Sequence, residues 1–196
     1  MPKSYTETER TLIRNRLQEE AVKCLSQYCV RHTTVDELVK RVHIPKGTFY
    51  LFYPSKEMLL FEVIQKEHER INRQLFDALK TLQPQQINAE VLTDLIYDFF
   101  RMTEQMPILK LMESGDVDLL VRKLPPETVQ AHFKEDTDDI AKLFALLPIR
   151  KEVDIETVSA AFHAIYYATL HAQQIGENRY DQALRMLIHG VVSQIL

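Results

Sequence analysis

TTVDELVKRVHIPKGTFYLFYPSKEMLL, residues 33–60, is the stretch that decides the fold. Thr34 and Glu37 have the spacing of a capping box, which satisfies orphan amides at the start of a helix. His43 falls in a tight turn, where a positive φ is expected at a cost of about 1 kcal/mol for a residue other than glycine. Pro45 suits the start of a second helix because its φ is fixed and it lacks an N–H group. The stretch therefore predicts two short helices joined by a tight turn.

The second of these helices is predicted to bury aromatic side chains on one face. At 100° per residue, Phe49, Phe52 and Tyr53 share that face, whereas Gly47 and Leu51 lie opposite. Two short helices that cross through such a turn form a helix-turn-helix, and the second is narrow enough to enter a DNA major groove. Because glycine has no side chain, Gly47 lets the backbone come close to a phosphate or a base edge.

The stretch resembles the DNA-binding segment of TetR-family transcriptional regulators, most densely from Lys46 to Leu59. That pattern runs T-T-V-x-x-I-A-x-x-A-G-V-S-K-G-T-x-Y-x-x-F-x-S-K-E-x-L. This chain departs from it at the turn, where His43 replaces a glycine and Pro45 replaces a serine. Leu51 and Phe52 also stand where Tyr or His is common. The resemblance implies an N-terminal three-helix DNA-binding head and a helical ligand-binding and dimerisation body.

The remaining sequence favours an all-α protein of about nine helices, because glycine is rare and strand-like alternation is hard to find. A long fourth helix, predicted from Ser55 to about Leu82, joins the head to the body. We expect a helix-turn-helix DNA-binding domain over residues 1–54. Residues 55–196 are expected to form the effector-binding and dimerisation domain.

Charge is distributed unevenly along the chain. Residues 1–56 contain ten Lys and Arg against six Asp and Glu, a net charge of +4, whereas residues 57–196 carry −8. A basic module on an acidic body fits DNA binding at one end, although chance variation in surface charge remains the alternative. The candidate DNA contacts are Thr48 and Tyr50 for the groove, Gly47 for close approach, and Thr34, Lys46 and Lys56 for phosphates.

The last two long helices, predicted over residues 154–176 and 179–196, combine small residues with a wide apolar band. Such a pattern suits helices that are buried on two sides. One interpretation is a two-fold homodimer in which these helices form a four-helix bundle, and the other is a pair of central helices in a monomer. The family resemblance favours the homodimer. The predicted interface residues are Phe162, Ile165, Thr169, Leu184, Leu187, Ile188, Val191 and Ile195.

Aromatic, methionine and histidine side chains in the body are candidates for an effector pocket, since family members usually bind a small molecule there. A mainly apolar pocket with a few polar groups suits that role, and ordinary core packing is the alternative. The pocket candidates are Tyr97, Phe100, Met106, Met112, Phe133, His163, Tyr166 and Tyr167. No recognisable ligand spacing predicts a metal site.

Catalytic motifs are absent from the sequence: it has no nucleophile elbow, no phosphate-binding glycine loop and no zincin helix. We therefore expect no enzyme activity, no cofactor and no metal. No apolar run approaches a membrane span, and cysteine usage favours a cytoplasmic protein. The leading hypothesis is a dimeric repressor that binds a palindromic DNA operator and is released by a small effector. Its rivals are an activator, a helical protein–protein adaptor and a helical enzyme.

Overall fold

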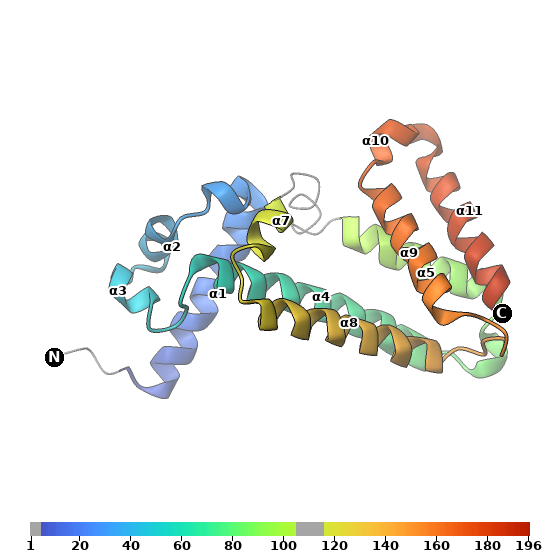
Figure 1. Ribbon diagram of the computed structural model, residues 1–196, viewed down its shortest axis with the longest axis horizontal. Helices are drawn as coiled ribbons and strands as arrows, with labels where there is room; N and C mark the ends of the chain where they lie inside the picture. Colours follow the sequence, from blue (N-terminus) through green and yellow to red (C-terminus); the bar gives the residue numbers. More distant parts are fainter. Residues whose placement is uncertain (1–4, 105–115) are drawn as a thin grey trace. The chain divides into compact units, whose positions relative to one another are not determined.

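The computed structural model describes residues 5–104 and 116–196, and the elements of this part are helical. The N-terminal half contains α1 (Glu7–His32), α2 (Val35–Val42), α3 (Lys46–Phe49), α4 (Lys56–Thr81), the 3-10 helix η1 (Pro84–Gln86) and α5 (Ala89–Glu104). The C-terminal half contains α7 (Asp116–Val121), α8 (Pro126–Ala145), α9 (Ile155–Thr169), α10 (Ala172–Ile175) and α11 (Glu177–Ile195) (Figure 1). The all-α prediction is confirmed. The sequence also predicts a short helix over residues 107–114, which lie outside the described residues.

Capping residues mark several helix starts. Thr6 and Glu9 form a complete capping box at the start of α1, since the Thr6 N–H donates to Glu9 Oε2 at 2.8 Å and the Glu9 N–H donates to Thr6 Oγ1 at 3.3 Å. Asn88 caps α5, and its Oδ1 accepts the backbone N–H groups of Glu90 and Val91 at 3.0 Å. These helices begin where short polar side chains satisfy their first amides.

The helix predicted over residues 154–176 is interrupted, which corrects that prediction. The α-helical conformation of α9 ends at Thr169, and His171 has φ −118° and ψ 26° before α10 begins. The Thr169 Oγ1 donates to the carbonyl of Tyr166 at 2.7 Å. A threonine that bonds back to its own helix offers the backbone an alternative to regular helical pairing.

Contacts along the chain divide it into two compact units. The described parts of residues 1–67 and 107–129 form the first unit, and those of residues 68–106 and 130–196 form the second. These two units are defined by contacts within the chain. The boundary predicted after Pro54 instead separates the expected DNA-binding domain from the expected effector-binding and dimerisation domain. The two-domain assignment at that boundary therefore stays a prediction.

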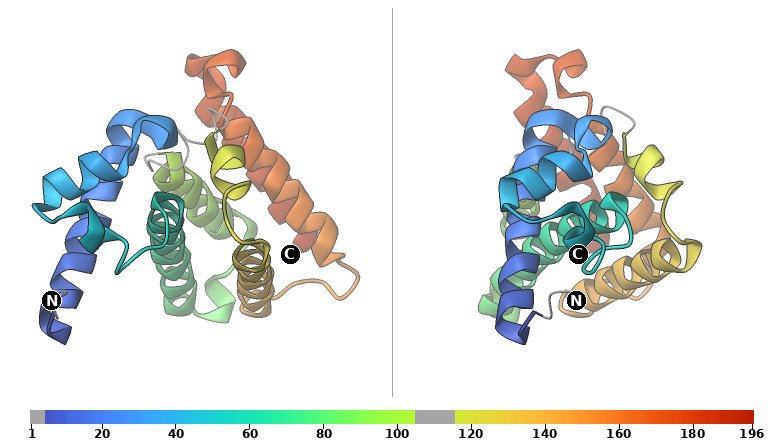
Figure 2. Two further views of the ribbon diagram at one scale, coloured as in Figure 1. Left: turned by 60° about the vertical axis from the view of Figure 1, so that its left-hand side comes forward. Right: turned by 90° about the vertical axis from the view of Figure 1, so that its left-hand side faces the viewer.

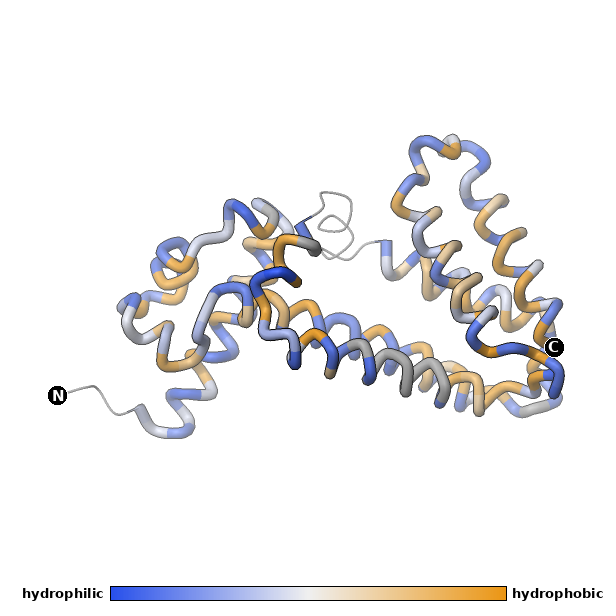
Figure 3. Tube along the Cα trace, viewed as in Figure 1, coloured by the Kyte–Doolittle hydropathy of each residue, from blue (hydrophilic) through white to orange (hydrophobic). Residues whose placement is uncertain are grey.

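The core of the first unit is built around the helix-turn-helix stretch. Leu17 and Leu25 of α1 pack with Leu38 of α2, Phe49 of α3 and Leu60 of α4. Hydrophobic positions recur along α4 between hydrophilic ones (Figure 3), as expected for a helix that buries one side. The aromatic face predicted for the second motif helix thus lies against α1 and α4.

A later segment of the chain completes this first unit. Leu120 of α7 and Leu124 belong to the same core. The Asp116 carboxylate is buried, where it accepts the Val30 N–H at 3.2 Å and Arg31 Nε at 3.1 Å. This segment therefore holds the C-terminal end of α1 through a buried, hydrogen-bonded charge.

The second unit has its own core, made by α5, α9 and α11 with the C-terminal ends of α4 and α8. Figures 1 and 2 show α9 and α11 running side by side in opposite directions. The core residues include Leu75, Leu92, Ile96, Phe100, Phe144, Val158, Ile165, Leu184, Ile188, Val192 and Ile195.

Across residues 5–104 and 116–196, none of the helices is both long and apolar enough to cross a membrane.

Candidate nucleic-acid interface

The turn between α2 and α3 has the geometry that the sequence predicts. Thr34 is the N-cap of α2, and its Oγ1 accepts the Glu37 N–H at 3.2 Å. His43 closes the helix in the left-handed region at φ 59° and ψ 45°, and it is the sole described residue other than glycine with positive φ. Pro45 then caps α3 with φ −62°. The predicted positive φ at the turn is confirmed, and a histidine adopts it at a cost in stability.

Aromatic packing holds α3 in place from behind. Phe49 is fully buried, and its ring lies 6.0 Å from that of the buried Tyr53. Phe52 is half-buried between the Tyr5 ring at 6.4 Å and the Arg10 guanidinium at 5.4 Å. The aromatic face predicted for this helix is therefore confirmed, with the buried side fixed by large rings.

The opposite side of α3 is open to solvent. Lys46, Gly47, Tyr50 and Leu51 are all exposed, and at 100° per residue they form one continuous arc. A Cβ atom built on Gly47 meets nothing within 4 Å, so the glycine leaves a gap in this arc. We call these four residues the α3 face. Three of them are sequence candidates for DNA contact, and Leu51 is an addition that only its exposure reveals.

A surface ion pair at the edge of the α3 face links the two motif helices. Lys46 Nζ lies 2.8 Å from one carboxylate oxygen of Asp36 on α2 and 3.0 Å from the other. The hydrogen bond and charge of Asp36 raise the pKa of Lys46 above its usual value. Both side chains are exposed, and exposed pairs of this kind contribute little to stability. A phosphate group can therefore replace Asp36 as the partner of Lys46 at small cost.

Thr48 does not lie on the α3 face, and its assignment as a groove contact stays a prediction. Its side chain is 7 % exposed, and its Oγ1 lies 3.2 Å from the hydroxyl of Tyr5. The hydroxyl pair joins the start of the chain to α3. No local pattern in the sequence predicts a contact between residues 43 positions apart.

Two other basic residues at the motif have partners inside the first unit. Lys56 Nζ donates to the carbonyls of Val30 at 2.8 Å and Thr33 at 2.5 Å, which ties the end of α1 to the start of α4. Arg14 lies 2.8 Å from Glu62 and also stacks over the Tyr53 ring at 5.3 Å. The predicted phosphate contact by Lys56 stays a prediction, and the geometry gives this lysine a structural role.

The effector candidates of the body are dispersed among the described residues. Phe100 is packed in the core, whereas His163 and Tyr167 are exposed on α9. Tyr97 is half-buried under the Arg185 guanidinium at 5.9 Å. Burial and the neighbouring Tyr167 raise the pKa of the Tyr166 phenol to about 12. Met106, Met112 and the side chain of Phe133 lie outside the described part of the chain.

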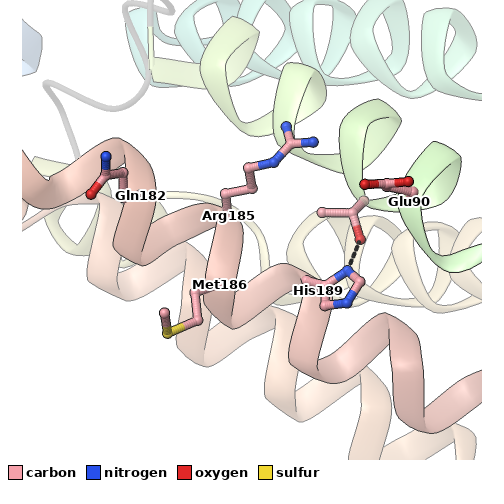
Figure 4. A pocket seen from close by; sticks show the side chains of 6 residues that line it. Glu90, Gln182, Arg185, Met186 and His189 are labelled. Carbon is pink, nitrogen blue, oxygen red and sulfur yellow. Dashed lines mark hydrogen bonds between the residues drawn. The ribbon is translucent and has the colours of Figure 1, made fainter.

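An open groove of about 290 Å³ lies between α5 and α11, and none of the effector candidates lines it. Its lining is Glu90, Thr93, Gln182, Arg185, Met186 and His189. Figure 4 shows the His189 side chain with a dashed hydrogen bond, and the His189 Nδ1 lies 3.2 Å from the Thr93 Oγ1. A site for a small organic effector is usually an enclosed cleft or cavity, so this open groove does not fit that role.

Most of the predicted dimer residues are buried or half-buried in the core of the chain itself, so the predicted interface stays a prediction. Ile165, Thr169, Leu184, Ile188 and Ile195 are buried, and Phe162 and Val191 are half-buried. Only Leu187 is exposed. The two helices also show a regular series outside the core that we call the outer stripe. It consists of Ala160, Ala164 and Tyr167 of α9 and Ala183, Leu187 and Gly190 of α11, of which Ala183 is half-buried and the others are exposed.

Residues 17–63 match the family model of bacterial regulatory proteins of the tetR family. The chain is also similar to YhgD of Bacillus subtilis, an uncharacterised HTH-type transcriptional regulator. The two are 24 % identical over 140 residues, which is 69 % of this chain and 72 % of YhgD.

Two solved structures share the fold. One is a TetR family transcription regulator from Marinobacter aquaeolei, with a TM-score of 0.65 at 16 % identity over 97 % of this chain and 98 % of that chain. The other is FadR from Bacillus subtilis in complex with stearoyl-CoA, with a TM-score of 0.62 at 15 % identity over 91 % of this chain and 95 % of that chain. At such low identity, these likenesses establish the fold alone.

Proposed function

This chain belongs, through residues 17–63, to the tetR family of bacterial regulatory proteins, and on that premise we propose that it represses transcription as a ligand-responsive homodimer. The observation that carries the proposal is the α3 face, an exposed arc with a gap at Gly47, supported from behind by buried aromatic rings. Such a helix enters a major groove and presents its exposed side chains to base edges.

The contacts to DNA divide into positioning and reading. Lys46 and Thr34 are exposed at the starts of the two motif helices, where an ammonium and a hydroxyl donate to phosphates. Tyr50 is 51 % exposed on the α3 face and supplies a groove contact. Phosphate contacts fix the orientation of the protein, whereas the groove contact carries sequence information.

The outer stripe supports a homodimer. Its residues recur at i, i+4 and i+7 on α9 and again on α11, so each helix has a line of mostly small side chains outside its core, opposite the core on α9 and beside it on α11. Small side chains let helix backbones approach closely, and an exposed apolar stripe is typical of an interaction site. A two-fold pairing of these helices gives a four-helix bundle and places two α3 faces on a palindrome.

A small effector bound in the helical body provides the regulation in this proposal. FadR of Bacillus subtilis has this fold and carries stearoyl-CoA in its crystal structure, which supports ligand binding by such a body. For the effector to release DNA, it must bind the conformer with low operator affinity more tightly than the conformer with high affinity.

The DNA-binding proposal is tested by selecting duplexes from a random pool at low salt. We expect enrichment of a palindrome whose affinity falls steeply as salt rises, because phosphate contacts release counterions. Tyr50→Ala is expected to weaken binding, while Tyr28→Ala, a matched loss of a tyrosine that is 45 % exposed, leaves it unchanged. Failure to enrich any symmetric duplex would refute the proposal. If the protein instead bound a protein partner with little dependence on salt, the helical protein–protein adaptor would be supported.

The homodimer is tested by light scattering on Gly190→Arg. The Cβ position of Gly190 is open in the single chain, so the arginine does not disturb folding but blocks a close helix pairing. We expect Gly190→Arg to be monomeric and Gln74→Arg, on an exposed side of α4, to remain dimeric. Wild-type protein that is monomeric at all concentrations contradicts the dimer.

The effector is sought by mass spectrometry of the denatured, purified protein. A compound found in this way is then tested for its ability to release the protein from bound operator.

A further inference from the structure

Leu51 is an exposed apolar residue in the middle of a surface otherwise suited to polar DNA contacts. Its side chain is 54 % exposed, and it belongs to neither hydrophobic core. The helical turn continues to this point, since the Leu51 N–H donates to the Thr48 carbonyl at 3.1 Å. Leu51 therefore lies beside Gly47 on the α3 face, on the side away from Lys46.

Single exposed leucines are common on protein surfaces and usually need no explanation. Leu51 differs because of its neighbours. The gap at Gly47 brings the backbone of α3 close to whatever the helix contacts, and Tyr50 and Leu51 both project beside that gap. Any ligand of the α3 face must therefore cover the leucine side chain.

The chemistry of the leucine side chain restricts what it can recognise. It neither donates nor accepts a hydrogen bond, so it cannot pair with a phosphate or with the polar edges of adenine, guanine and cytosine. Thymine is the one base that offers an apolar group in the major groove, its 5-methyl group. We infer that Leu51 is a specificity-determining residue that selects thymine in each half-site by covering this methyl group. The inference rests on the proposed function.

The inference is tested by removing the thymine methyl groups of the selected duplex. Each thymine is replaced in turn by deoxyuridine, which keeps every hydrogen-bonding group and lacks only the methyl. At one position per half-site, the wild-type Kd is expected to rise about fourfold, the ratio that corresponds to one buried methyl group. Leu51→Ala is expected to bind thymine and deoxyuridine at that position equally well. Leu12→Ala, on an α1 leucine that is 52 % exposed, keeps the wild-type discrimination.

A second variant changes the base preference itself. Leu51→Gln supplies an amide that bonds to adenine in the major groove, so a new selection is expected to replace thymine at that position with adenine. Both variants alter an exposed side chain, so both are expected to remain folded. Circular dichroism is the measurement that checks this.

The outcomes separate the two proposals. If a palindrome is enriched but no thymine methyl couples to Leu51, the inference is wrong while the regulator function stands. An unchanged base preference in Leu51→Gln likewise overturns it. If no duplex is enriched by the wild-type protein, the proposed function fails first and the inference falls with it.

Discussion

Gly47→Ala is the substitution that separates folding from DNA binding most clearly. Among the described glycines, only Gly176 has positive φ, so the backbone at Gly47 is available to alanine. A Cβ at Gly47 also meets nothing within 4 Å. Neither the conformation nor the packing of the chain therefore requires a glycine here. If a glycine is required, the requirement comes from the molecule that α3 binds.

Gly47→Ala is expected to raise the stability of the folded chain and to weaken its binding to the operator. In the folded chain, alanine replaces the residue that loses most backbone freedom, so the free energy of unfolding rises by about 0.5–1 kcal/mol. For a chain of this size, that corresponds to a melting temperature about 1–4 °C higher. On DNA, the methyl occupies the gap beside Tyr50 and Leu51, and an added methyl in a close contact costs about 1–3 kcal/mol. The operator Kd then rises about 5- to 150-fold.

Thermal unfolding by circular dichroism and fluorescence anisotropy with the selected duplex measure the two effects. A duplex without the palindrome is the control, because binding through phosphates alone depends less on how closely α3 enters the groove. A variant that melts at a higher temperature but binds the operator with the wild-type Kd would refute the reasoning. The surface around Gly47 would then not lie against DNA.

Three further substitutions test the first unit. His43→Gly removes the strain of a side chain in the left-handed conformation at φ 59°, a gain of about 1–2 kcal/mol. The greater backbone entropy of glycine in the unfolded chain offsets part of this gain. The variant is therefore expected to be about 0.5–1 kcal/mol more stable in urea unfolding. Burial alone would raise the pKa of Glu62, but the hydrogen bond and charge of Arg14, together with Tyr53 and Lys66, outweigh it, so the folded pKa lies below the ordinary value of 4.5. A carboxyl group whose pKa is lower in the folded than in the unfolded state stabilises the fold at a pH above the unfolded pKa. The free energy of unfolding is therefore expected to fall as the pH drops below about 4.5. Glu62→Gln is expected to lose less of its stability over the same acid titration. Asp116→Ala leaves the Val30 N–H without its buried acceptor and is expected to lower the free energy of unfolding by about 1–3 kcal/mol, whereas Asp116→Asn, which keeps an acceptor, loses less in the same urea experiment.

Features set by neighbouring residues were predictable from the sequence. The cap at Thr34 and the left-handed turn at His43 depend on a few consecutive residues, because helix ends must satisfy their own amides and a tight turn must reverse the backbone. The aromatic face of α3 follows from helical periodicity alone. The fold class and the existence of the motif could therefore be predicted before any tertiary contact was known.

Features set by distant contacts were not predictable in the same way. Thr48 looks like a groove residue from its place in the motif, but the hydroxyl of Tyr5 covers it. Lys56 looks like a phosphate contact, but the backbone carbonyls of Val30 at the end of α1 and of Thr33 accept its ammonium hydrogens. Each of these side chains has the right chemistry for DNA. Its availability depends on which part of the chain packs beside it, and that is a property of the tertiary structure.

The proposed homodimer face on α9 and α11 differs from the one that apolar periodicity alone predicts. Large apolar residues such as Ile188 are drawn into the core of the single chain, because burying them there already yields the full hydrophobic gain. A surface that must stay in water until a second copy arrives is better served by side chains with little area to hide. Ala164 and Gly190 are such residues, and their value lies in the close helix approach that they permit. On a helix with a core side already filled, we therefore expect small residues at i, i+4 and i+7 outside that side to indicate a homodimer interface better than the largest apolar residues do.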